Sequence, residues 1–112
     1  MKDHDRIIIQ KIIQYSTDAL NCISGCSYDN FVADKKTVFA CAFAIGQIGE
    51  LANLLSEETK TEYATIPWRS IRGMRNRVVH DYNNVDMAVL WSTISESLPE
   101  LIGQLEGMLH GM

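Results

Sequence analysis

The sequence lacks the features that mark secreted, membrane-spanning and zinc-binding proteins. It has only 3 cysteines in 112 residues, and an odd number without a Cys-x-x-Cys pair argues against a disulfide framework or a zinc site. Acidic residues precede the first isoleucines, so the start does not resemble a signal peptide. The longest apolar run, Val38 to Gly46, is far shorter than the roughly 20 residues that cross a bilayer. We therefore expect a cytoplasmic protein with reduced thiols and no membrane partner.

The chain also lacks an excess of positive charge. Its 10 lysines and arginines against 14 acidic residues give a net charge of -4. This balance excludes a protein whose whole surface binds polyanions, although it leaves room for a local basic patch. An apolar content of 46% can fill a modest core, so disorder is not indicated. We expect one domain over residues 1–112.

The alternation of apolar and polar residues that marks strands is absent, whereas apolar steps of three and four residues recur. These steps predict helices over about 3–24, over 35–55, from Pro67 to a frayed end at 81–84, and from an N-cap at Asp86 onward. The connector over 25–34 is rich in turn-forming residues, with room for one helical turn. Pro99 should kink or split the last helix. The predicted fold is an all-α antiparallel bundle of four to five helices.

The predicted helix over 35–55 has almost no polar face, because residues 38–45 are all apolar. Small residues such as Ala42, Gly46 and Gly49 would permit close approach of another helix. A chain of this length has few helices with which to surround a fully apolar one. A second copy would cover the remaining face, which predicts a homodimer; a central helix inside a monomeric bundle is the alternative.

Residues 75–82 read Arg-Asn-Arg-Val-Val-His-Asp-Tyr. An arginine can hold a phosphate with two hydrogen bonds, and an imidazole can carry a proton near neutral pH, so the segment supplies two roles needed to cleave a phosphodiester. Arg69, Arg72, Arg75 and Arg77 form a cluster with no acidic residue among them, which favours phosphate binding. The alternative is a helix end with surface charges, where the histidine serves as a cap.

Arg75 falls inside the apolar stripe of an ideal helix over this segment. A guanidinium there must be paired or must line a cleft, because removing water from an unpaired one is costly. A salt bridge with Glu50 or another carboxylate is the structural alternative. His80 falls on about the opposite face. The two side chains meet only if the helix distorts before His80, or if one subunit of a dimer brings its arginine to the histidine of the other.

The run from Arg75 to Tyr82 matches the Arg-x-x-x-x-His-x-Tyr motif of HEPN-domain proteins, and it resembles HepT-type toxins of HEPN/MNT toxin-antitoxin systems. The resemblance extends over most of the chain. Its other parts are Gln47-Ile48-Gly49-Glu50, Ile66-Pro67-Trp68, Ile71-Arg72-Gly73-Met74, Val85-Asp86, Leu90-Trp91 and Leu98-Pro99.

The resemblance implies a HEPN-like helical dimer in which two copies of the motif face one cleft and cut RNA without a metal or other cofactor. His80 would be the catalytic histidine, Arg75 the catalytic, phosphate-binding arginine and Asn76 a polar helper beside it. Arg69, Arg72 and Arg77 are further candidates for RNA binding. Tyr82 would be the position that a nucleotidyltransferase (MNT) antitoxin, on a separate chain, modifies with adenylate. The implied reaction is attack of a ribose 2'-hydroxyl on its adjacent phosphate.

Two other functions are compatible with the same residues. One is a non-catalytic helical module that docks a separate nucleotidyltransferase and serves it as a substrate or regulatory subunit. The other is a small-molecule or nucleotide-binding bundle, which only the arginine cluster favours. RNA cleavage that resists a chelator would favour the nuclease, and partner binding without cleavage would favour the module.

Overall fold

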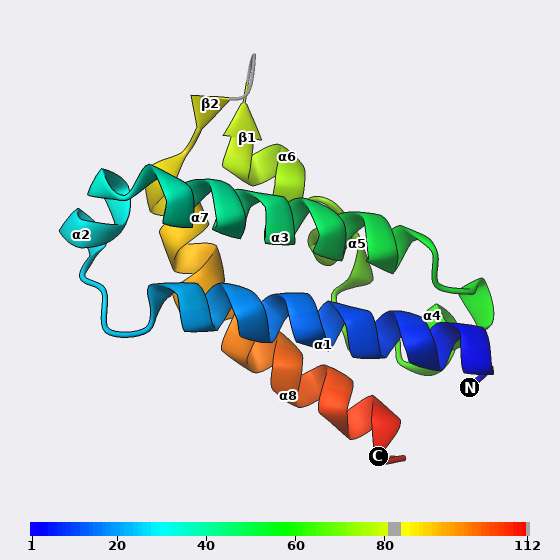
Figure 1. Ribbon diagram of the computed structural model, residues 1–112. Coiled ribbons are helices and arrows are strands. Elements are labelled where there is room, and N and C mark those ends of the chain that lie inside the picture. Colours follow the sequence, from blue (N-terminus) through cyan, green and yellow to red (C-terminus); the bar gives the residue numbers. More distant parts are fainter. Residues whose placement is uncertain (81–83, 112) are drawn as a thin grey trace.

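The computed structural model describes residues 1–80 and 84–111, and of His80 the backbone alone. This part of the chain is almost wholly helical (Figure 1). The helices are α1 (Asp3–Ile23), α2 (Tyr28–Ala33), α3 (Lys35–Asn53), α4 (Glu57–Glu62), α5 (Trp68–Arg72), α6 (Met74–Val78), α7 (Met87–Ser92) and α8 (Leu98–Leu109), with a π-helical turn, η2 (Thr93–Ser97), between the last two. Two-residue strands β1 (Val79–His80) and β2 (Asn84–Val85) pair antiparallel. The predicted all-α class is confirmed, but the described residues form more and shorter helices than the four to five predicted.

Helices α1 and α3 run antiparallel along the length of the molecule (Figure 1). Helix α8 packs against α1, while α5 and α6 pack against α3. Buried side chains recur at steps of three and four along α3, at Val38, Cys41, Ala44, Ile48 and Ala52, which is the spacing of one helical face. Because α3 contacts both α1 and the α5–α6 segment, it lies between α1 and the segment that carries the predicted motif.

Side-chain caps fix several helix starts. Asp86 was predicted to cap the last helix, and its Oδ1 accepts the Val89 N–H at 3.1 Å. Ser56 caps α4 in the same way through the Thr59 N–H. The predicted helices over 3–24 and 35–55 agree with α1 and α3 to within a residue or two at each end, and α2 supplies the helical turn predicted in the connector. Helix α4 is an addition that the periodicity did not predict.

The prediction of one helix from Pro67 through Tyr82 was wrong. The helix begins at Trp68, is interrupted at Gly73 and ends at Val78. Residues 81–83 lie outside the described part of the chain. The helix ends where hydrogen bonds of a short hairpin replace the helical ones, because the Val78 carbonyl accepts the N–H of Asp86 at 2.7 Å and Val79 pairs with Val85. Two successive β-branched residues also favour extended backbone here.

The last helix is divided, as Pro99 led us to expect, but the irregular turn precedes the proline. Pro99 is the second residue of α8, and η2 occupies the turn before it. A proline has no N–H for the carbonyl four residues earlier, and its ring crowds that carbonyl, so the preceding turn widens. Thr93 Oγ1 and Ser95 Oγ each donate to a carbonyl four residues back, at 2.7 Å.

A buried carboxylate ties the start of α1 to the start of α4. Asp5 is 0% exposed, and it accepts hydrogen bonds from the Ser56 N–H at 3.0 Å, from Ser56 Oγ, and from Thr59 Oγ1 at 2.6 Å. Burial alone would raise the pKa of Asp5, but the hydrogen bonds from Ser56 and Thr59 outweigh it and lower the pKa to about 2. Asp5 therefore holds together two helix ends that are about 50 residues apart in sequence.

All three cysteines are free. Cys41 is buried in the core, and this burial, with a smaller effect of Cys22 and Cys26, raises the pKa of the Cys41 thiol to about 12. Within the described residues, no helix has both the length and the apolar character needed to cross a membrane.

Candidate active site

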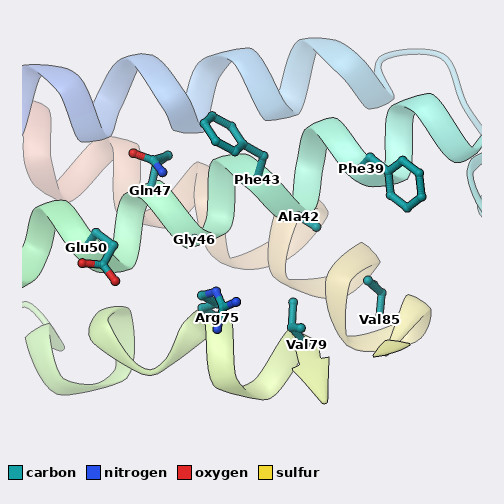
Figure 2. A pocket seen from close by; sticks show the side chains of 9 residues that line it. All are labelled: Phe39, Ala42, Phe43, Gly46, Gln47, Glu50, Arg75, Val79 and Val85. Atoms are coloured by element: carbon teal, nitrogen blue, oxygen red, sulfur yellow. The ribbon is translucent and has the colours of Figure 1, made fainter. Parts of the chain in front are cut away.

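A cleft lies between α3 and the α5–α6 segment, and Arg75 is at the point where its two parts meet (Figure 2). We call the larger part the apolar chamber; its volume is about 400 Å³. It is lined by Phe39, Ala42, Phe43, Gly46, Gln47, Glu50, Arg75, Val79 and Val85. We call the smaller part, of about 250 Å³, the polar chamber. It is lined by Gly46, Gly49, Glu50, Asn53, Arg72, Arg75 and Asn76.

Two glycines of α3 allow the α5–α6 segment to come this close. A Cβ atom at Gly49 would lie 3.3 Å from the carbonyl oxygen of Arg72, and one at Gly46 would lie 3.6 Å from Arg75 Cδ. The first separation is tighter than nearly all Cβ contacts, and the atom it meets is backbone. The missing side chains therefore set the distance between α3 and the arginines.

Arg75 is exposed at the edge of the cleft rather than directed into the core. Its helical neighbours Met74 and Val78 are buried instead. Of the two roles the sequence allowed for this arginine, lining a cleft is the one observed. The alternative, a salt bridge with Glu50, is not formed, because no carboxylate of the described residues lies within 4.0 Å of the Arg75 guanidinium. The cation is thus available to an anionic ligand.

The other predicted residues separate into two groups. Arg72 and Asn76 line the polar chamber together with Arg75. Arg69 lies instead in a surface hollow beside Lys60, and Arg77 lies in a pocket between α6 and α8. The structure thus brings two of the four arginines into one cleft. Two arginines against the single carboxylate of Glu50 give the described cleft a positive charge on an otherwise acidic protein.

His80 follows Val79, which lines the apolar chamber, and its backbone pairs with Asn84. The His80 side chain and the whole of Tyr82 lie outside the described residues. The sequence left two ways for His80 to approach Arg75, and the end of α6 at Val78 is the helix distortion that one of them required. Beyond Val78 the helical repeat of 100° per residue no longer sets which way the chain faces.

Several residues of the cleft were not predicted as site residues. Asn53 shares the polar chamber, and its spacing of three and four residues from Glu50 and Gly49 would have placed it on their face of a helix. Phe39 and Phe43 line the apolar chamber although they are 66% and 60% exposed. The apolar helix predicted over 35–55 therefore does leave part of its face uncovered.

No cluster of three histidine, cysteine, aspartate or glutamate side chains suited to holding a metal ion occurs among the described residues. The polar groups of the cleft are guanidinium, amide and carboxylate. Such a set can bind a phosphate through Arg72, Arg75 and Asn76, and can accept a hydrogen bond through Glu50.

Comparison with known proteins points to one family. The family model described as "Ribonuclease HepT-like" matches residues 8–108. A protein of Thermococcus cleftensis named "Probable ribonuclease HepT" is 39% identical over 79 residues, which cover 70% of this chain and 72% of that protein. A protein of Caldanaerobacter subterraneus subsp. tengcongensis, named "Putative RNase TTE0752", is 30% identical over 105 residues, which cover 94% of this chain and 94% of that protein. No solved structure gives a significant match. The chain therefore belongs to the HepT-like ribonuclease family.

Proposed function

We propose that this protein is a toxin that cleaves RNA internally and without a metal ion, at a site formed where two protomers meet. The observation that carries the proposal is the exposed Arg75 guanidinium, which has no carboxylate partner among the described residues and lies in a cleft five residues before His80. The family supplies the RNA substrate, since relatives are named as ribonucleases.

Arg75 has the chemistry to bind the phosphate that is cut. A guanidinium forms two parallel hydrogen bonds with phosphate oxygens and stays charged at any physiological pH. Asn76 and Arg72 line the same chamber and add donors to the same ligand. Charge that develops on the phosphate in the transition state is stabilised by donors already in place, which lowers the barrier to cleavage.

His80 carries a proton in the proposed reaction. The ribose 2'-hydroxyl attacks the adjacent phosphate, and the product ends in a cyclic phosphate. Because the nucleophile belongs to the substrate, neither an activated water nor a metal-bound hydroxide is required, and DNA, which lacks the 2'-hydroxyl, is not cut.

A second copy of the chain covers the open side of α3 in this proposal. Phe39 and Phe43 are mostly exposed next to the apolar chamber, and large exposed aromatic side chains beside a cleft are typical of protein interfaces. A two-fold dimer through this surface places both copies of the Arg75-to-His80 segment beside one shared cleft.

The antitoxin in this proposal is an MNT-type nucleotidyltransferase on a separate chain that transfers adenylate to Tyr82. The added phosphate brings negative charge and bulk next to a cleft that must admit RNA, so binding is blocked. The support for this step is the motif tyrosine two residues after His80. A Tyr82→Phe variant should cleave RNA but escape modification by such an enzyme.

Cleavage of total RNA in the presence of a chelator tests the nuclease proposal. The wild-type protein should cut and leave cyclic phosphate ends, and His80→Ala should lower the rate by about 10²-fold or more, because proton transfer contributes roughly that much. His110→Ala is the matched control, since His110 is an exposed histidine at the far end of α8, and it should cut like the wild type.

Full activity of His80→Ala would refute the assignment. If the wild-type protein binds a nucleotidyltransferase but leaves RNA intact, the chain is the non-catalytic module instead.

A further inference from the structure

The proposed cleavage needs two proton movements, and each imidazole accounts for only one of them at a time. A shared cleft would hold two copies of His80, so the competing explanation is that the two histidines divide the movements between them; in that case His80→Ala would stay slow on RNA with sulfur in place of the bridging 5'-oxygen. The proton of the 2'-hydroxyl must leave as its oxygen attacks phosphorus. A proton must also reach the 5'-oxygen as its bond to phosphorus breaks, because an alkoxide is a poor leaving group. A second group that can exchange a proton is therefore expected near the scissile phosphate.

Glu50 is the one carboxylate among the described residues that line the cleft, and it lines both chambers, as Arg75 does. Figure 2 shows Glu50 on α3 and Arg75 on α6, with both side chains at the gap between the two helices. The close approach at Gly49, next to Glu50 in sequence, brings this part of the α3 backbone close to the arginine-bearing segment.

The surroundings of Glu50 indicate what it binds. It forms no ion pair within the described part of the chain, so its oxygens are available as acceptors. A bare carboxylate beside a bound phosphate is repelled, but a carboxylate that accepts a hydrogen bond from a hydroxyl group next to that phosphate is stabilised. In RNA the hydroxyl adjacent to the scissile phosphate is the ribose 2'-hydroxyl.

The charged groups that share the cleft with Glu50 are Arg72 from α5 and Arg75 from α6. The other helices packed on α3, namely α1, α2 and α7, contribute no charged side chain to the described lining of either chamber. Among the described lining residues, Glu50 is therefore the one side chain that can accept a proton, because guanidinium and amide groups cannot.

Resting on the function proposed above, we propose that Glu50 is a further catalytic residue, the general base of the cleavage. Glu50 takes the proton of the 2'-hydroxyl as the bond from the 2'-oxygen to phosphorus forms. The bond from phosphorus to the 5'-oxygen breaks, and His80, in its protonated form, gives its proton to that oxygen. The products are a 2',3'-cyclic phosphate and a 5'-hydroxyl, and both side chains regain their starting protonation from water.

Glu50→Gln tests the assignment in the full-length protein, with Glu106→Gln on the exposed side of α8 as the matched control. Under single-turnover conditions, Glu50→Gln should cut RNA about 10²-fold to 10³-fold more slowly. Its affinity for RNA with a 2'-deoxy sugar at the cut position should be equal or tighter, since a negative charge has been removed. The acidic limb of the pH–rate profile should flatten in Glu50→Gln, and Glu106→Gln should match the wild type throughout.

RNA with sulfur in place of the bridging 5'-oxygen separates the two roles. A thiolate leaves without a proton, because thiols are far more acidic than alcohols. His80→Ala should therefore cut this substrate at close to the wild-type rate, while Glu50→Gln should remain slow on it.

The outcomes distinguish this inference from the function on which it rests. Wild-type cleavage by Glu50→Gln, or its rescue by the sulfur substrate, overturns the role of Glu50 and leaves the nuclease proposal intact. A wild-type protein that cuts no RNA, or a fully active His80→Ala, overturns the nuclease proposal itself.

Discussion

Replacing Asp5 with asparagine should weaken the fold in a pH-dependent way. The lowering of its pKa from 3.8 to about 2 corresponds to about 2.4 kcal/mol at neutral pH, at roughly 1.36 kcal/mol per pKa unit. Asparagine keeps one oxygen that can accept part of these hydrogen bonds, so we expect a loss of about 1–2 kcal/mol in the free energy of unfolding. With an unfolding entropy of roughly 2.1 cal/mol/K per residue, this loss lowers Tm by about 4–9 °C.

Urea unfolding of Asp5→Asn and Asp3→Asn at several pH values is the appropriate assay. Both residues lie in the first turn of α1 and share its dipole effect, but Asp3 is exposed and should cost only about 0.3–1 kcal/mol. Because the pKa of Asp5 is depressed in the folded state, its contribution is fully present above about pH 4 and is lost as the pH falls toward 2; at pH 3 roughly half remains. Equal stability of the two variants, or a deficit in Asp5→Asn that does not shrink between pH 5 and pH 3, would refute the reasoning.

Two further predictions concern helix approach and assembly. Gly103→Ala, where an added Cβ meets nothing within 4 Å, should raise stability by about 0.5–1 kcal/mol in thermal unfolding; Gly49→Ala, whose Cβ would press on the Arg72 carbonyl, should not, and should slow RNA cleavage as well. Phe39→Asp and Phe43→Asp should convert a dimer to monomers in sedimentation experiments and abolish cleavage, whereas monomeric wild-type protein that still cuts RNA would contradict a shared site.

The long helices could be predicted because the residues that specify each of them are close together in the sequence. Apolar side chains recur along α1 and α3 at the helical period, and Asp86 caps α7 with its own side chain. Helix α4 could not be predicted in this way, since its residues, Glu-Glu-Thr-Lys-Thr-Glu, carry no apolar stripe. Its position depends on Asp5, about fifty residues away in sequence.

The candidate site could be predicted only in part, because some of its geometry depends on contacts between separate elements. Arg75 could be identified because it is a charged residue within the apolar stripe of a predicted helix. Lining a cleft was one of the two roles that this position allowed, and pairing with a carboxylate was the other. The end of α6 before His80 was only one of two alternatives from the sequence, because it depends on a hydrogen bond from the Asp86 N–H to the Val78 carbonyl that joins two separate parts of the chain. The spacing of Asn53 places it on the same face of α3 as Gly49 and Glu50, but only the packing of α5 on α3 makes this face one wall of a cleft.

The change from helix to strand after Val78 has a consequence for how this part of the chain can evolve. Within a continuous helix, inserting or deleting one residue between Arg75 and His80 would turn the histidine about 100° around the axis. Here the pairing of Val79 with Val85 anchors the backbone next to His80, so a gained or lost residue can be accommodated where α6 joins β1. The number of residues between Arg75 and His80 is therefore not fixed by the helical repeat. It can change during evolution while the pairing of β1 with β2 is retained.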